Sequence, residues 1–400
     1  MNGRFLVFTG FLINICLGAI YSFSIFRAPL EKLWGISATQ SGLPFMVFLL
    51  MFSIFMAASG GLIKKLGPRK TSLIGSIMVG TGWIGASFSP NIETMTALYG
   101  IIGGAGVGVV YGCPIAVSAT WFPRRSGLAI GLTVMGFGLS GVIIAPILTN
   151  LIRIFGPLQT FLYAGLAFLL VLTILSLVLR FPPSETSQGL KVTTGVRQDY
   201  DTDLNRVQMV KSLSFYALWS AYMIGCLAGL MAIGISSPFG REIAKIDEYV
   251  ANLTITVFSV FNGFGRPLFG WITDKLNPRK SAMLSFTLIL ASSTALYLFG
   301  EGNTPVYLLS FSLLWLNLGG WLAMAPTMTK TLFGTKYYSE NYGVVFTAYG
   351  VGAIAGTYLS GMLKDITGTY LSVFPIVILL ATLGILIVFL GLKPVRHRSA

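Results

Sequence analysis

The sequence predicts an all-α membrane protein with twelve transmembrane helices in two pseudo-symmetric six-helix bundles. Three observations support this fold class. Of the 400 residues, 54% are hydrophobic and only 10% are charged, whereas soluble proteins carry about 25% charged residues. About twelve apolar runs approach the roughly 20 residues that a helix needs to cross a bilayer. A charged motif also recurs after the second and the eighth run.

The apolar runs form two sets of six, separated by the longest polar stretch of the chain. That stretch, residues 181–212, contains Pro, Gly, Ser, Thr and both signs of charge, which is typical of a linker. We therefore expect an N-terminal bundle over residues 1–180 and a C-terminal bundle over residues 213–400. The predicted spans are 5–26, 41–63, 72–89, 96–119, 127–151 and 157–179, then 213–236, 250–272, 281–299, 305–329, 342–363 and 370–392.

The two sets also repeat each other in sequence. GGLIKKLGPRK follows the second span and GWITDKLNPRK follows the eighth, 210 residues later. At this offset Lys65 aligns with Lys275, Arg69 with Arg279 and Lys70 with Lys280. Matching loops at matching places indicate a duplicated bundle. Carriers built in this way bind their substrate between the halves and rock one half against the other.

The net charge of +14 orients the chain rather than pointing to a nucleic acid. With the N-terminus inside, 20 of the 27 Lys and Arg residues fall on the cytoplasmic side, 6 fall on the opposite side, and Arg266 lies in the membrane. Arg27 is among the 6. This is the positive-inside pattern, and it places both termini in the cytoplasm of a cell whose inner membrane holds the protein. The three scattered cysteines suggest neither a disulfide framework nor a metal site.

Arg266 is the most informative residue of the sequence. It lies inside the eighth apolar run, and we place every Asp and Glu in a loop or at a span edge, so no acid of the protein is positioned to pair with it. A buried cation needs a counter-charge or water. The substrate is then the natural anion, because the guanidinium offers two parallel hydrogen bonds to a carboxylate. The alternative is an arginine that reaches the headgroups or ties helices together through carbonyl groups.

The neighbours of Arg266 fit a binding site. Thr256, Ser259, Asn262 and Arg266 are spaced three and four residues apart, which places them on one helix face. Asn262 would either bind substrate or position the guanidinium. Pro267 removes one helical hydrogen bond and should kink the helix beside the site.

Several stretches resemble the major facilitator superfamily, and within it the monocarboxylate transporters and oxalate–formate antiporters. They are NGFGRPLFGWITD (262–274), GAGVGVVYG with WFPRRSGLAIGL (104–132), and GAIYSFSIFRAPL (18–30). The resemblance implies that Arg266 binds the carboxylate and that Tyr111 lies in the cavity. It also assigns the repeated loop motif to gating at the cytoplasmic side, through Asp274, Lys275, Arg279 and Lys280 and through Lys65 and Arg69. In the N-terminal copy Lys64 replaces the acid of the motif.

Other departures from this family narrow the expected substrate. Asn262 stands where animal monocarboxylate transporters have an aspartate linked to proton coupling, and Tyr349 stands where oxalate exchangers have a second cation. One fixed charge suits one carboxylate. Tyr21, Tyr111 and Tyr349 would supply hydrogen bonds in the central cavity or fill space as packed aromatic rings.

The sequence thus predicts a secondary carrier, not an enzyme, for a small monocarboxylate such as lactate or pyruvate. Following the resemblance, we expect a proton to accompany the anion; the alternative is carboxylate exchange without protons. The expected partners are the substrate, the proton and the lipid bilayer, and we expect a monomer without cofactor or metal. The spelling GFGLSG (136–141) matches a dinucleotide loop, but it has no preceding strand and lies inside a predicted span, so we expect no dinucleotide site there. We expect the glycines of the fourth span to allow close helix contact: Gly103, Gly104, Gly106, Gly108 and Gly112.

Overall fold

The computed structural model describes residues 3–122, 126–182, 203–334 and 337–392. Within these ranges the regular structure is entirely helical. The N-terminal half contains α1 (Gly3–Leu17), the 3₁₀ turn η1 (Gly18–Ser22), α2 (Ser24–Trp34), α3 (Ala38–Ala86), α4 (Ile92–Met95), the π-helix η2 (Thr96–Gly103), α5 (Gly104–Trp121) and α6 (Ser126–Val178).

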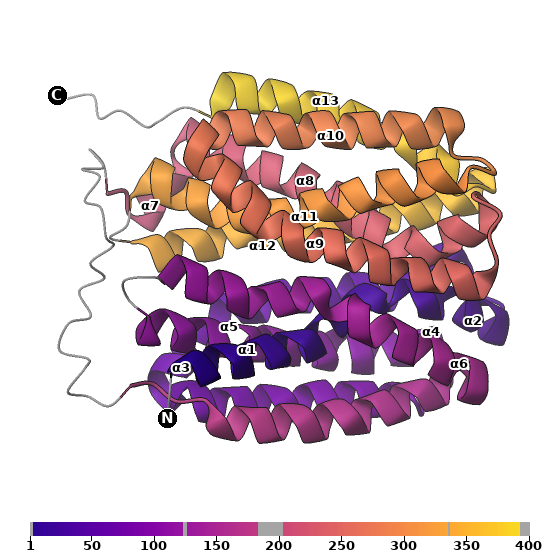
Figure 1. Ribbon diagram of the computed structural model, residues 1–400, viewed down its shortest axis with the longest axis horizontal. Helices are drawn as coiled ribbons and strands as arrows, with labels where there is room; N and C mark the ends of the chain where they lie inside the picture. Colours follow the sequence, from indigo (N-terminus) through magenta and orange to yellow (C-terminus); the bar gives the residue numbers. More distant parts are fainter. Residues whose placement is uncertain (1–2, 123–125, 183–202, 335–336, 393–400) are drawn as a thin grey trace.

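The C-terminal half has a separate long helix for each span. It contains α7 (Arg206–Val210), α8 (Leu213–Glu242), α9 (Glu248–Leu276), α10 (Pro278–Phe299), α11 (Thr304–Phe333), α12 (Tyr338–Thr367), the 3₁₀ turn η5 (Tyr370–Val373) and α13 (Phe374–Gly391). The two halves lie side by side in Figure 1, with the indigo-to-magenta helices below and the red-to-yellow helices above.

Two of the long helices each contain two predicted spans. α3 turns back at Gly67, with φ 77° and ψ 166°, and α6 turns back at Gly156, with φ 79° and ψ 172°. Each glycine precedes a proline, and only glycine adopts this conformation readily. Nine helices in the described ranges are long and apolar enough to cross a membrane. Counting α3 and α6 as two spans each, and adding α9, gives the twelve spans that the sequence predicts.

The outer surface of the bundle is apolar, as a bilayer requires. Phe88 is 74% exposed, Leu379 is 67% exposed and Ile154 is 63% exposed. Exposed apolar side chains on so many helices would be a liability in water and are the normal surface of a membrane protein.

Inside the bundle, small residues let helices approach each other closely. A side chain on Gly106 of α5, for example, would place its Cβ 2.6 Å from the backbone nitrogen of Val79 on α3. The glycines of the fourth span therefore serve helix packing, as the sequence predicts.

The halves are in contact along two seams, α6 against α9 and α3 against α12. We call the end that carries α2 the α2 end, and the end where α6 finishes and α7 begins the linker end (Figure 1). The bundle boundaries at residues 180 and 213 stay a prediction, because most of the linker lies outside the described residues.

Candidate substrate-binding site at the seam between the halves

Arg266 lies inside the protein, at the seam between α9 and α6. Its side chain is 4% exposed, which excludes a guanidinium that reaches the lipid headgroups. Nη1 donates a hydrogen bond to the carbonyl oxygen of Val134 in the other half, over 2.6 Å. The guanidinium also lies over the ring of Phe137, with Cζ 5.8 Å from the ring centroid. Nε and Nη2 are buried and have no hydrogen-bond partner among the described residues.

The polar face of α9 predicted from the sequence points at this seam. Thr256 donates to the carbonyl oxygen of Gly141 over 3.5 Å, and a Cβ on Gly141 would overlap Oγ of Ser259 in its present position. Asn262 is fully buried; its Nδ2 donates to the carbonyl oxygen of Trp315 on α11 over 2.9 Å, and its Oδ1 is unpaired. α9 stays helical through Pro267.

The glycines of GFGLSG allow this close contact between the halves. A Cβ on Gly138 would lie 2.8 Å from Cα of Gly263 and 2.9 Å from Oδ1 of Asn262. The stretch lies wholly within α6. Its glycines therefore serve helix packing.

Two of the three candidate tyrosines, Tyr21 and Tyr111, lie near Arg266, and the third is bonded to Tyr21. Tyr21 in η1 and Tyr349 in α12 share a hydrogen bond of 3.1 Å between their hydroxyl groups, which joins the two halves. The charge of Arg266 interacts electrostatically with Tyr21 and with Tyr111 in α5. The structure thus brings together all five residues predicted to bind substrate: Arg266, Asn262, Tyr21, Tyr111 and Tyr349.

Three aromatic residues of this region were not singled out by the sequence. Phe137 of α6 lies edge-on to Tyr21 at 5.0 Å and to Tyr111 at 5.5 Å between ring centroids. Phe52 of α3 packs edge-on against Tyr111 at 5.2 Å, and Trp315 lies 6.2 Å from Tyr21. The wall around the guanidinium is therefore aromatic as well as apolar.

The side chain of Asn317, on α11, makes two hydrogen bonds within the protein. Its Oδ1 accepts a hydrogen bond from Ser285 on α10 over 2.6 Å, and its Nδ2 donates to Leu313 over 2.7 Å. Asn317 therefore forms an interhelical hydrogen bond.

The repeated motif lies at the linker end and is not brought to Arg266. Lys275 lies over the ring of Trp271 at 5.1 Å, and Arg279 lies over the ring of Phe389 at 4.3 Å. Arg279 also donates to the carbonyl oxygen of Phe389. Lys280 is in the first turn of α10, and Lys65 and Arg69 flank the turn at Gly67. Asp274 is part of α9, but its side chain is outside the described part of the chain. The gating role of these residues stays a prediction.

The position of Arg27 differs from the sequence prediction, which placed this residue in a loop. It belongs to α2 and is only 1% exposed. Its guanidinium donates to Ser41 Oγ over 3.0 Å, to the carbonyl oxygen of Gly234 over 3.0 Å and to that of Ala38 over 2.5 Å. The apolar run ends at Phe26, but the helical path continues to Trp34 and turns this arginine inward. All three guanidinium nitrogens of Arg27 are thus bonded, whereas only Nη1 of Arg266 is.

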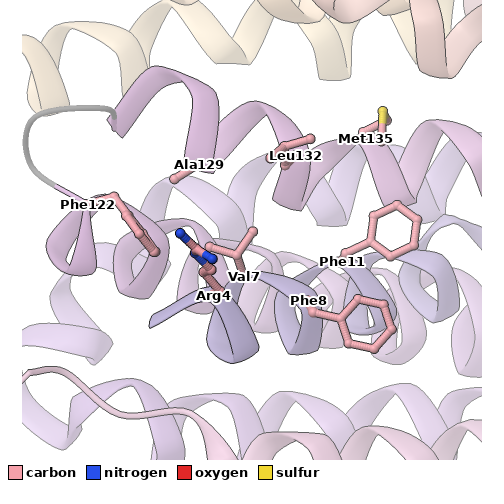
Figure 2. Close-up of a pocket in the computed structure, with 8 residues that line it drawn as sticks. All are labelled: Arg4, Val7, Phe8, Phe11, Phe122, Ala129, Leu132 and Met135. Atoms are coloured by element: carbon pink, nitrogen blue, oxygen red, sulfur yellow. The ribbon is translucent and has the colours of Figure 1, made fainter. Parts of the chain in front are cut away.

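A separate pocket of about 570 Å³ lies between α1 and α6 and contains none of the predicted site residues. Figure 2 shows its lining, which is apolar except for one cation: Arg4, Val7, Phe8, Phe11, Phe122, Ala129, Leu132 and Met135.

Paired helical halves in a membrane, with a partly unpaired cation buried at their seam, define a solute carrier. The comparisons with known proteins agree. The family model of the Major Facilitator Superfamily matches residues 7–243 and 213–400. The chain therefore belongs to the major facilitator superfamily.

Similar proteins are found among carboxylate carriers. The oxalate:formate antiporter of Oxalobacter formigenes is 27% identical over 357 residues, which is 88% of this chain and 82% of that protein. Monocarboxylate transporter 12-B of Danio rerio is 26% identical over 348 residues, or 80% of this chain and 72% of that protein.

Among solved structures, a bacterial homologue of the human lysosomal transporter Spinster has the same fold. Its inward-facing, unoccupied form gives a TM-score of 0.74 at 15% identity, over 99% of both chains. Its inward-facing, occupied form gives a TM-score of 0.72. At this identity the likeness concerns the fold alone.

Proposed function

We propose that the protein is a secondary carrier of a small monocarboxylate, such as lactate or pyruvate, and that Arg266 pairs with the carboxylate. The observation that carries this proposal is the contrast between the two buried arginines. The protein bonds every nitrogen of Arg27 but leaves Nε and Nη2 of Arg266 unpaired. Leaving buried charged donors unpaired is unfavourable by several kcal/mol. An anion delivered by the substrate removes this penalty.

The position of the unpaired nitrogens suits a carboxylate. Nε and Nη2 form one edge of the planar guanidinium, and this edge donates two parallel hydrogen bonds to the two oxygens of one carboxylate. Nη1 is held by Val134 on the opposite side of the seam. We propose that this bond fixes the orientation of the fork, and that Tyr111 and Asn262 add hydrogen bonds to the bound anion or to the guanidinium.

The number of carboxylates follows from the charges at the seam. Tyr21 and Tyr349 bond to each other as neutral hydroxyl groups, so they provide no second cation. A dianion would keep one carboxylate unpaired among aromatic rings, which is unfavourable in a low-dielectric site. We therefore propose a monocarboxylate rather than oxalate as the preferred substrate.

We propose further that a proton accompanies the anion. The second candidate is exchange of carboxylates without protons, which is favoured by the similarity to an oxalate:formate antiporter. An imposed pH gradient separates the two candidates, because it should drive uptake in the first and leave it unchanged in the second.

Uptake of labelled short carboxylates into proteoliposomes tests the role of Arg266. The panel comprises formate, acetate, lactate, pyruvate and oxalate. Arg266→Gln removes both unpaired donors and should reduce uptake of every accepted acid at least about a hundredfold, as expected for a lost charge-assisted pair of about 3 kcal/mol. Arg266→Lys keeps the charge but not the fork and should retain part of the activity.

Arg206→Gln is the matched control, because Arg206 starts α7 at the exposed linker end. It should transport like the wild-type protein. Substantial accumulation of carboxylate by well-folded Arg266→Gln protein would remove the central assignment.

We also propose that the protein works as a monomer in the inner membrane with both termini in the cytoplasm. The start of α1 and the end of α13 lie at the same end of the bundle (Figure 1), which agrees with the distribution of Lys and Arg in the sequence.

A further inference from the structure

The first contact that closes the α2 end is the buried Arg27. It lies in the N-terminal half, and two of its three hydrogen bonds stay there, to Ser41 and Ala38. The third crosses to the C-terminal half and ends on the carbonyl oxygen of Gly234 in α8. Its guanidinium also lies 5.8 Å from the ring centroid of Tyr370, again in the C-terminal half. Ser41, which accepts from Arg27, donates to Glu31, so a carboxylate of the same half offsets the charge.

The second contact is made by Asp365, in the last turns of α12. Its two carboxylate oxygens accept from the backbone N–H groups of Ala38 and Thr39, each over 3.0 Å. These N–H groups begin α3 in the other half and have no partner within their helix. A carboxylate at this position is also favoured by the helix dipole. The helices are close enough for this because Gly361 allows it: a Cβ there would lie 2.6 Å from Cα of Thr39.

A third contact lies at the same end, where α6 meets α9. Arg153 of the N-terminal half lies over the ring of Tyr249 in the C-terminal half, 5.2 Å from its centroid. The cross-half contacts of Arg27, Asp365 and Arg153 come from three different helices. None of these contacts involves a residue that we place at the substrate.

We propose that Arg27 and Asp365 form the gate at the α2 end, and that the carrier opens toward this end by breaking their bonds to Gly234 and to the start of α3. The proposal rests on the membership of a carrier family and not on the identity of the substrate. In a carrier that rocks one half against the other, each closed end must come apart once per cycle. Arg27 and Asp365 donate and accept across the halves through backbone groups, which remain correctly placed whenever the halves return.

A path of hydrogen bonds also connects this gate to the site. Asn262, one turn before Arg266, donates to the carbonyl oxygen of Trp315, whose indole N–H donates to Ser236 over 3.0 Å. Ser236 lies two residues after Gly234, the acceptor of Arg27. A shift of α9 or α11 at the site would therefore be transmitted through α8 to the gate.

Spin-label distances test the gate without any transport assay. One label pair reports the α2 end, at Phe88 and Leu298, which are 74% and 59% exposed in opposite halves. The other reports the linker end, at Leu66 and Leu276, which are 41% and 44% exposed. Asp365→Asn should raise the ratio of α2-open to α2-closed molecules about two- to fivefold, as expected for a lost anion at a helix N-terminus. The 88–298 distance should gain a longer component, and the 66–276 distance a shorter one.

Arg27→Gln should have the same effect with larger amplitude, and Arg27→Lys an intermediate one. Glu242→Gln is the matched control. Glu242 is a charged residue at the same end, but it pairs with Arg241 and Lys364 within the C-terminal half alone. It should leave both distances unchanged. Because Asp365 is exposed, its variant should fold even if Arg27→Gln does not. Wild-type distances in Asp365→Asn, or equal shifts in Glu242→Gln, would overturn the proposal.

Discussion

Asn277 holds a backbone conformation that side chains rarely adopt. Its φ is 81° and its ψ is 160°, a region populated almost only by glycine and unfavourable for other residues by about 1–3 kcal/mol. The equivalent position in the N-terminal half is Gly67. Asn277 compensates in part, because its Oδ1 accepts from the backbone N–H of Lys280 over 3.1 Å and caps α10.

Two substitutions of Asn277 should therefore change the stability of the protein in opposite directions. Asn277→Ala keeps the strain and loses the cap, so it should destabilise the protein by about 1 kcal/mol. Asn277→Gly relieves the strain and loses only a few tenths of a kcal/mol of capping, so it should stabilise by about 1 kcal/mol. Thermal unfolding of the purified variants measures both effects. A glycine variant that is less stable than the alanine variant would contradict this account.

Sequence reasoning found Arg266 because a lone charge stands out in an apolar run, but it missed Arg27 and the aromatic wall. Arg27 follows directly on the last apolar residue, so hydropathy ends the span before it. Phe137 and Trp315 do not stand out in the sequence, because the chain contains 29 Phe and 7 Trp residues. An aromatic residue becomes informative only when the fold places it beside a charge. The roles of the predicted site residues stay predictions.

The contact between α6 and α9 depends on residues without side chains. A Cβ at Gly141 would overlap Oγ of Ser259, and one at Gly138 would lie within 3 Å of Gly263 and Asn262. The Cβ at Gly138 would push α9 away from α6 and displace Arg266 from Val134, because it meets the backbone of α9, whereas the Ser259 hydroxyl can rotate away from a Cβ at Gly141. The seam therefore positions the guanidinium as well as joining the halves.

Alanine substitutions on one helix test this role. Gly138→Ala should lower substrate affinity tenfold or more and destabilise the protein by about 1–3 kcal/mol through overpacking, and Gly141→Ala should have a smaller effect. Gly131→Ala is the control on the same helix, because nothing lies within 4 Å of its Cβ. It should leave transport unchanged. Binding and thermal unfolding measure the two effects, and a Gly138→Ala protein with wild-type affinity would contradict the positioning role of the seam.

The membrane-spanning helices could be predicted from the sequence, because the bilayer constrains their hydropathy and length. A single segment that crosses the bilayer outside a barrel must be helical and long enough to span it. Every predicted span coincides with helical structure, although the first is divided among α1, η1 and α2. The α2 helix, the π-helix η2 and the turns at single residues were not predicted. They depend on local packing and on special backbone angles, which hydropathy does not record. The loop expected after the second span is replaced by the turn at Gly67.

At the scale of the whole molecule, the bond between Arg266 and Val134 joins the two halves that must rock. When α9 leaves α6, Arg266 loses its hydrogen bond to the Val134 carbonyl and has one acceptor fewer unless the substrate supplies another. The empty carrier should therefore switch slowly, and exchange of substrate should exceed net uptake about tenfold or more, since one unpaired buried charged donor is unfavourable by at least about 1.5 kcal/mol.

Proteoliposomes loaded with the substrate test this expectation. Counterflow of labelled substrate is compared with net uptake into empty vesicles at the same external concentration. Equal rates would refute the expectation and would indicate that water or a proton resolves the charge of Arg266 during the return step.

The turns at Gly67, Gly156 and Asn277 have a further consequence for the behaviour of the carrier in lipid. Each joins two spans through one residue, so neither arm of such a hairpin can slide along the other. The paired arms keep a fixed apolar height. A thinner or thicker membrane can then be matched only by tilting a whole hairpin or by deforming the surrounding lipid. The turnover of this carrier should therefore vary with acyl-chain length, with an optimum where the hairpins stand untilted.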